Sequence, residues 1–297
     1  MDIEKLDSFM TLAKVQNFTS AAEQLYISQP ALSKRIGSLE NELNVLLFNR
    51  IGKKIFLTHE GEYFYNFAKN TIANYNLLKE NIIQIKNIES GTLKFGATNF
   101  IGVYIMPKII KAFTKKYPNI DIRMTISSSK NIISQLETNE LEFIFVSDYI
   151  IGSESNLITQ DLTTDELKVI VSKNNALSQK DRCTFQDIKN QKYISKGDKS
   201  SQDSFIKEIL DKNGYDFSHK IIINNQEAIK EAVINNIGFS IISEKSISRE
   251  LELGLLKAIE LKDIKFIRKI QYSYIKYLQL TPAATEFLAL AKNIYVK

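Results

Sequence analysis

Residues 1–45 contain three helical patterns joined by very short breaks, and this feature limits the possible folds more than any other. Apolar residues recur at three- and four-residue spacing in residues 3–16, 21–25 and 31–43. Only a tight turn at Tyr26-Ile27 separates the second helix from the third. Three helices with so short a second connection are typical of a helix-turn-helix unit.

Polar residues at the breaks predict where the second and third helices begin. Thr19 or Ser20 is expected to cap the second helix, since Ser20 and Glu23 have the spacing of a capping box. Ser28 is expected to cap the third helix, with Pro30 in its first turn, where the missing N–H costs little. The capping pattern therefore agrees with the apolar spacing.

The third predicted helix exposes polar side chains that suit nucleic acid. Gln29, Ser33 and Lys34 lie opposite its apolar stripe. Glutamine can read adenine through two hydrogen bonds, and serine and lysine can contact bases or phosphates. Taken alone, such residues also fit a solvated surface, but the helix pattern around them favours DNA.

Two short apolar segments follow, and they flank a basic tip. Residues 47–50 and 55–57 predict a two-stranded wing around Gly52-Lys53-Lys54, which is suited to phosphates or a minor groove. The net charge is +5, yet residues 1–90 carry equal numbers of basic and acidic residues. Nucleic-acid binding by this part must therefore depend on positioned charges and not on bulk charge.

These motifs together resemble a known family. Residues 18–36 (FTSAAEQLYISQPALSKRI), Leu39-Glu40 and residues 46–50 (LLFNR) are similar to the winged helix-turn-helix of LysR-type transcriptional regulators. Residues 58–61 (THEG) resemble the motif that opens the linker helix of that family. The resemblance implies a transcriptional regulator that binds a partly palindromic promoter site, and not an enzyme. As an activator, it would also contact RNA polymerase. The residues it implies at the DNA are Thr19, Ser28, Gln29, Pro30, Ser33, Lys34, Arg35, Arg50, Lys53 and Lys54.

A single long helix is predicted from Thr58 to about Ile88, because this run contains no proline and only Gly61. It carries an a/d-type apolar seam. The alternative is a helix packed on its own domain, but so long a seam on a connector favours a partner helix. The resemblance implies that two such helices pair in a dimer, and it suggests a tetramer. The seam residues are Phe64, Ala68, Thr71, Tyr75, Leu78, Ile82 and Ile85.

Strands and helices alternate beyond Glu89-Ser90-Gly91, which predicts an α/β fold with crossovers. The family's effector domain resembles type 2 periplasmic binding proteins, with two α/β lobes and a cleft between them. That resemblance divides the chain into a winged helix-turn-helix (1–58), a linker helix (59–89) and an effector-binding domain (91–297). Lobe I is expected over about 91–162 and 268–297, and lobe II over about 163–267.

Four segments follow predicted strands where helices begin, and such positions suit anions. By the resemblance all four face the cleft, where we expect a small anionic effector such as a carboxylate or an oxyanion. The alternative is that the serines only cap helices and that the lysines are solvated. The predicted effector-binding residues are Thr98, Asn99, Phe100, Ile101, Ser127, Ser128, Ser129, Lys196, Lys199, Ser200, Ser201, Asn225 and Gln226.

Other classes of protein fit the sequence poorly. Gly238-Phe239-Ser240 lacks the second glycine of G-x-S-x-G, and Asp198-Lys199-Ser200 lacks the glycines of a P-loop. With one cysteine (Cys183) and two distant histidines, no Cys/His zinc cluster and no intramolecular disulfide can form. We therefore expect no cofactor or metal, and a packed thiol in place of a redox sensor.

The rival functions are a solute receptor and an enzyme on the same bilobal fold. The N-terminus lacks the basic start and apolar core of a signal peptide, and no stretch approaches the ~20 apolar residues of a membrane span. We therefore expect a soluble, cytoplasmic protein without membrane contacts. The N-terminal 90 residues argue against a receptor, and the missing catalytic motifs argue against an enzyme.

Overall fold

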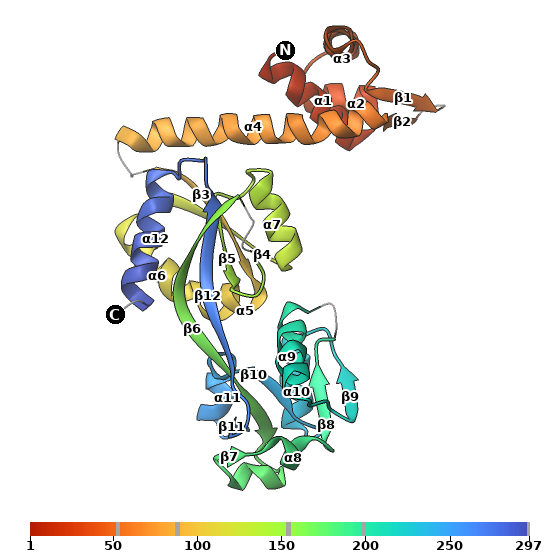
Figure 1. Cartoon of the computed structure of the whole chain (residues 1–297). Helices are drawn as coiled ribbons and strands as arrows, with labels where there is room; N and C mark the ends of the chain where they lie inside the picture. The colour runs from red at the N-terminus through yellow and green to blue at the C-terminus, as the bar shows by residue number, and fades with distance from the viewer. Residues whose placement is uncertain (52–53, 87–89, 153–155, 198–199, 296–297) are drawn as a thin grey trace.

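The computed structural model describes residues 1–51, 54–86, 90–152, 156–197 and 200–295. Figure 1 shows a small helical domain at one end of a long helix, with a two-lobed α/β part below it. Lys53 and Lys199 lie outside the described residues, and so do the side chains of Arg50, Lys54 and Ile85.

The N-terminal domain has the predicted three helices and an antiparallel wing. Ala21 and Ala22 are buried, since their small side chains let the second helix pack closely on its neighbours. The ring of Phe9 lies at the centre of the core, 5.1 Å from the ring of Phe48 and 4.9 Å from that of Phe64. The elements are α1 (Ile3–Val15), α2 (Phe18–Gln24), α3 (Gln29–Leu43), β1 (Phe48–Ile51) and β2 (Lys54–Leu57).

The cap of α2 differs from the prediction. Asn17, and neither Thr19 nor Ser20, caps this helix, and its side chain accepts a hydrogen bond from the N–H of Ser20. The helix begins two or three residues earlier than the predicted caps suggested, because Asn17 is an equally good cap and precedes both alternatives. Ser28 caps α3 and Pro30 lies in its first turn, as predicted.

Helix α4 (His59–Lys86) begins directly after the wing. The hydroxyl oxygen of Thr58 accepts a hydrogen bond from the N–H of Gly61, which anchors the first turn. A Cβ at Gly61 would approach the carbonyl oxygen of Leu47 to 2.1 Å, so only glycine fits there. The THEG motif is thus explained by one cap and one close backbone approach.

The predicted seam on α4 divides into a buried half and an exposed half. Phe64 and Ala68 belong to the core of the N-terminal domain, so the prediction that they face a partner helix is wrong. They pack within their own domain because the first turns of α4 lie against α1. Thr71 is half-buried. The described members beyond it, Tyr75, Leu78 and Ile82, are exposed.

Helix α4 also rests on the first lobe of the α/β part. Lys69 pairs with Glu140 at 2.5 Å, and the side-chain amide of Asn139 donates to Asn74 at 2.8 Å. A cavity of about 630 Å³, lined by both polar and apolar side chains, remains between α1, α4 and this lobe. The contact between α4 and lobe I is therefore made by polar side chains, with a cavity beside them.

One sheet runs through both lobes, in the order β4-β3-β5-β12-β6-β11-β7, with β10 also paired to β6. A separate parallel pair, β8-β9, lies in the second lobe. The strands are β3 (Gly91–Thr98), β4 (Ile120–Ser127), β5 (Phe143–Ser147), β6 (Leu157–Ser172), β7 (Arg182–Cys183), β8 (Lys192–Ser195), β9 (His219–Ile222), β10 (Ser240–Ser243), β11 (Leu256–Leu261) and β12 (Phe266–Ile275).

Helices cover the sheet in each lobe. Helices α5 and α6 are separate, because Pro107 in the first turn of α6 lacks the N–H that a continuous helix would bond to the carbonyl of Val103. The α-helices are α5 (Asn99–Tyr104), α6 (Met106–Lys116), α7 (Ser129–Glu137), α8 (Phe185–Ile188), α9 (Ser201–Lys212), α10 (Gln226–Ile234), α11 (Ser248–Glu252) and α12 (Pro282–Tyr295). Two 3-10 turns cover Ala176–Gln179 and Glu244–Ser246.

Each lobe has its own aromatic core. In lobe I the ring of Phe287 on α12 lies 4.8 Å from that of Phe95 and 5.2 Å from that of Phe113. In lobe II the ring of Phe217 lies 4.5 Å from that of Tyr193 and 5.2 Å from that of Phe239. The fold is therefore bilobal, as predicted.

The long strands β6 and β12 connect the lobes. They pair antiparallel over most of their length, from Phe266 opposite Leu167 to Ile275 opposite Leu157. Figure 1 shows both strands running from lobe I into lobe II. Among the described residues, this is the only strand pairing that extends through both lobes. It therefore fixes the side chains that these two strands direct towards the junction of the lobes.

Candidate functional site

The exposed end of α3 presents most of the residues predicted to contact DNA. Ser28, Gln29, Pro30 and Lys34 are exposed, and Ser33 is half-buried. Thr19 on α2, another predicted contact, is also exposed. Ser28 caps α3 by accepting a hydrogen bond from the N–H of Ala31, so the exposed residues Ser28, Gln29 and Pro30 form the start of this helix.

Arg35 differs from its neighbours on α3. Its guanidinium lies 2.6 Å from the carboxylate of Glu4 and donates to the hydroxyl of Ser8 at 3.2 Å. Both partners belong to α1, so the charge of Arg35 is already paired within the domain. Its main effect in this structure is to hold α3 against α1.

The predicted anion-binding segments meet at the junction of the two lobes. The hydroxyls of Ser129 (lobe I) and Ser201 (lobe II) are 3.0 Å apart. Within lobe II, the ammonium of Lys196 donates to the side-chain oxygen of Gln226 at 2.9 Å. Segments separated by more than 70 residues therefore lie together, and we call this region the lobe junction.

Several serine and asparagine side chains are engaged in helix caps. Ser128 caps α7 and Asn225 caps α10, and Ser127 accepts from the side chain of Asn131. By contrast, Thr98 and Ser200 precede α5 and α9 without a side-chain capping bond. The capping alternative therefore explains some of these polar residues and leaves others available.

The two apolar predictions at the start of α5 have different outcomes. The side chain of Ile101 is completely buried in the core of lobe I, so this residue could contact an effector only through its backbone N–H, and its place in the site stays a prediction. Apolar packing against the sheet takes priority at that position. Phe100 is buried as well, but its ring also faces the guanidinium of Arg268 at 4.4 Å. Asn99 is exposed.

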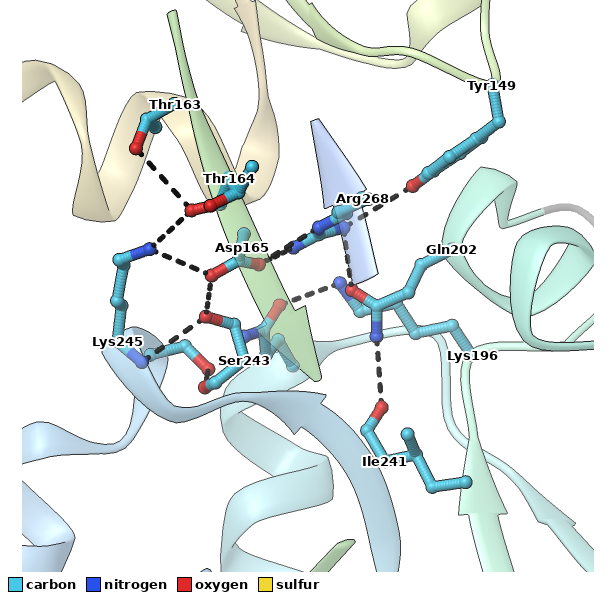
Figure 2. Close-up of polar contacts among 12 residues, drawn as sticks. Tyr149, Thr163, Thr164, Asp165, Lys196, Gln202, Ile241, Ser243, Lys245 and Arg268 are labelled. Carbon is cyan, nitrogen blue, oxygen red and sulfur yellow. Dashed lines mark hydrogen bonds and ion pairs between the residues drawn. The ribbon is translucent and has the colours of Figure 1, made fainter. Parts of the chain in front are cut away.

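The sequence analysis missed a polar cluster on the two connecting strands. Figure 2 shows Arg268 of β12 beside Asp165 of β6. The guanidinium donates from Nε to Oδ2 of Asp165 at 3.0 Å, and Nη2 lies 2.8 Å from the same oxygen. Ser243 and Lys245 reach the other carboxylate oxygen at 2.7 and 3.2 Å. Both Asp165 and Arg268 are about 2% exposed, so the pair is buried.

Arg268 also touches both lobes. Its Nη1 donates to the hydroxyl of Tyr149 at 3.3 Å and to the side-chain oxygen of Gln202 at 3.4 Å (Figure 2). Tyr149 in turn stacks on Phe205 of α9, with ring centroids 4.6 Å apart. The guanidinium therefore lies where lobe I, lobe II and the connecting strands meet.

One weak signal for this cluster exists in the sequence. Arg268 lies between Phe266 and Ile270, at the inward position of an alternating strand, where charged residues almost never occur unpaired. Its partner lies 103 residues earlier. The charge could have been flagged, but its partner could not.

Burial changes the charge balance near Lys196. Desolvation lowers the pKa of Lys196, while the nearby carboxylate of Asp203 opposes that shift and the positive charge of Arg268 adds to it. Burial likewise raises the pKa of Asp203, against the hydrogen bonds that its carboxylate accepts. An anion bound nearby would favour the charged form of Lys196.

Possible metal ligands and the single thiol were the remaining candidates for chemistry in the sequence. No group of three or more His, Cys, Asp and Glu side chains in that part of the chain could hold a metal ion. Burial raises the pKa of the Cys183 thiol to about 11, so it is protonated at neutral pH and poorly reactive. No helix in the described ranges is long and apolar enough to span a bilayer.

Comparisons with known proteins agree with this architecture. The profile of the bacterial regulatory helix-turn-helix protein, lysR family, matches residues 3–62, and that of the LysR substrate binding domain matches residues 86–294. A probable RuBisCO transcriptional regulator from Thalassiosira pseudonana is 34% identical over 274 residues, which is 90% of this chain and 89% of the relative.

Solved structures share the whole fold. A full-length OxyR variant from Pseudomonas aeruginosa superimposes with a TM-score of 0.75 at 22% identity, covering 100% of this chain and 95% of that one. Full-length CbnR complexed with its target DNA gives a TM-score of 0.73 at 16% identity, covering 99% of each chain. The chain therefore belongs to the LysR family of DNA-binding transcriptional regulators, with an effector-binding domain in its C-terminal part.

Proposed function

We propose that this regulator binds promoter DNA through the exposed end of α3 and responds to a small anionic metabolite at the lobe junction. The observation that carries the second half is the pair of cations there, Arg268 and Lys196, beside hydroxyls contributed by both lobes. An anion held between the lobes would bind one lobe arrangement more tightly than another. Such a shift would change how the DNA-binding domains are presented.

In this proposal the working unit is a dimer, and pairs of dimers form a tetramer. Tyr75, Leu78 and Ile82 leave an apolar stripe on α4 that a second α4 would cover. Pairing of the helices would fix the distance between two DNA-binding domains and hence between two half-sites. We further propose that the protein acts in the cytoplasm and activates transcription through contact with RNA polymerase.

The DNA half of the proposal is tested by Gln29→Ala combined with Lys34→Ala. In the double variant, the free-energy difference between binding the correct and a wrong base at the position that Gln29 reads is expected to fall by about 1–3 kcal/mol. The DNA affinity should also depend less steeply on salt concentration, because the contact between Lys34 and a phosphate is lost. Genome-wide capture of bound DNA supplies the operator, and titration against operator and mutated operator measures the loss. Lys14→Ala removes one exposed positive charge from α1 and serves as the control. A folded double variant with unchanged sequence preference would show that α3 does not read the bases.

The effector half is tested with Ser128→Leu. Small acids from the pathway of the regulated operon are added to the wild-type protein, where a ligand at about 100 times Kd raises the free energy of unfolding by about 2.7 kcal/mol. The variant is expected to lose this stabilisation and the accompanying change in the operator footprint. Its affinity for DNA in the absence of ligand should stay close to wild type, because α7 belongs to lobe I and lies on the other side of α4 from α3 (Figure 1). A variant that responds like wild type would exclude this segment from the site.

A further inference from the structure

The guanidinium of Arg268 is held on one edge and weakly bonded on the other. Nε and Nη2 face Asp165 at 3.0 and 2.8 Å. Among the residues that the structure describes, Nη1 has only neutral partners, Tyr149 at 3.3 Å and Gln202 at 3.4 Å, and both distances exceed the usual hydrogen-bond range. A carboxylate or phosphate oxygen would be a shorter and stronger partner for Nη1.

The charge of Arg268 is only partly neutralised. Asp165 is shared with a second cation, since Lys245 also pairs with it at 3.2 Å. These three groups, one carboxylate and two cations, therefore carry one net positive charge. The face of Phe100, 4.4 Å from the guanidinium carbon, shields this charge from water on one side.

Lys196 supplies a second positive charge from lobe II. The side chain is half-buried, and its hydrogen-bond acceptor, Gln226, is neutral and buried. Lys196 and Arg268 are close enough to affect each other electrostatically. The carboxylates of Asp203 and Glu227 also favour the charged form of Lys196, but its ammonium donates its hydrogen bond to a neutral amide. Each of the two cations therefore has a neutral acceptor that an anion could replace.

A purely structural role for Arg268 explains less of this geometry. A pair that only pinned β12 to β6 would need Nε, Nη2 and Asp165, which face each other in the strand register. It would not need Nη1 aimed between Tyr149 of lobe I and Gln202 of lobe II (Figure 2).

We propose that Arg268 and Lys196 together bind the acidic part of the effector, and that the effector is a small dianion, either a dicarboxylate or a phosphorylated compound. This inference rests on the proposed function, in which the ligand lies at the lobe junction. On binding, an effector oxygen replaces Tyr149 and Gln202 as the hydrogen-bond acceptor of Nη1. A second effector oxygen replaces Gln226 as the acceptor of the Lys196 ammonium. The two residues define the charge of the ligand, and the serines of α7 and α9 contact its remainder.

The test is calorimetric titration of the full-length protein with succinate, inorganic phosphate and acetate at one ionic strength. Wild type is expected to bind succinate or phosphate at least about tenfold more tightly than acetate, and which of the two binds tells a dicarboxylate from a phosphorylated ligand. Arg268→Gln and Lys196→Gln should each weaken dianion binding by about ten- to hundredfold, as expected for a lost charged hydrogen bond. Arg268→Lys, which keeps the charge without the planar fork, should fall between.

Controls separate binding from folding. Lys262→Gln removes an exposed lysine of lobe II and should bind within about threefold of wild type. Arg268→Gln leaves Asp165 without its main partner and could therefore prevent folding. Lys196→Gln keeps the test valid in that case, because Lys196 makes no bond to the connecting strands among the described residues.

Two results would overturn the inference: variants that bind dianions like wild type, or a wild type that binds neither succinate nor phosphate more tightly than acetate. Its failure differs from failure of the proposed function. If an operon metabolite still acts through Ser128 while neither dianion binds, the effector site stands and its assignment to a dianion is wrong. If no operon metabolite changes stability or footprint, the effector half of the proposed function is wrong as well.

Discussion

Replacing Leu78 and Ile82 together by aspartate is expected to convert the protein to monomers and to lower its operator affinity by about two to four orders of magnitude. Both side chains are more than half exposed on α4, at 54% and 55%, although they are large and apolar. Two α4 helices that pair through this stripe would bury four such side chains. Aspartate there brings buried like charges together, which opposes association.

The loss in affinity follows from avidity. A dimer that has bound one half-site holds its second domain at a high effective concentration beside the other half-site, and a monomer does not. Sedimentation velocity gives the oligomeric state, and titration of a two-half-site operator gives the affinity. Asn66→Asp adds a negative charge to an exposed position of α4 nearly opposite Tyr75, and should leave both measurements close to wild type. A double variant that stays dimeric would place the dimer contact elsewhere.

The sequence predicts the DNA-binding domain well because its signals are local. Caps, small residues and apolar spacing lie within one or two helical turns of the residues they organise, as Ser28 and Pro30 do for α3. The one error in the caps arose where Asn17, Thr19 and Ser20 compete over four residues. The seam on α4 was over-extended for a different reason. The spacing of apolar residues along a helix is the same whether they pack on their own domain, as Phe64 and Ala68 do, or remain exposed, as Leu78 does. The spacing alone therefore does not show which of them face a partner helix.

The α/β part shows what local signals leave out. Strand β12 is hard to predict from the sequence, because its inward row includes Arg268 and its outward row includes Ile267, which is 51% exposed, so the alternation of apolar and polar residues is broken. The serine-rich segments before α7 and α9 were found because polar residues follow strands there. The Asp165–Arg268 pair depends on the register of two distant strands, and no pattern within either strand sets that register.

That pair also gives the second large effect: Asp165→Asn is expected to lower the free energy of unfolding of the effector-binding domain by about 3–5 kcal/mol. The substitution keeps the size of the side chain but removes the negative charge that two cations share. Arg268 is then buried without a counter-ion, and Lys245, which is partly exposed, loses its pair as well. Guanidinium denaturation of the full-length protein, followed by circular dichroism, should show this loss in the transition of the α/β part, with that of the N-terminal domain unchanged.

The double variant Asp165→Asn with Arg268→Met decides whether the loss comes from an unpaired charge. Removing both members of a buried pair is often nearly neutral, whereas removing one is not, so the double variant should regain most of the stability. It should still fail to bind a dianion, because the cation is gone, and stability and ligand binding would then separate in one protein. The opposite outcome is a free energy of unfolding for Asp165→Asn within about 0.5 kcal/mol of the wild-type value, a difference typical of surface substitutions. It would mean that the carboxylate is solvated and that the lobes are open at this point in solution. In that case Arg268 is free to turn towards solvent, and the closed geometry around Tyr149 and Gln202 describes only one of the conformations that the lobes adopt.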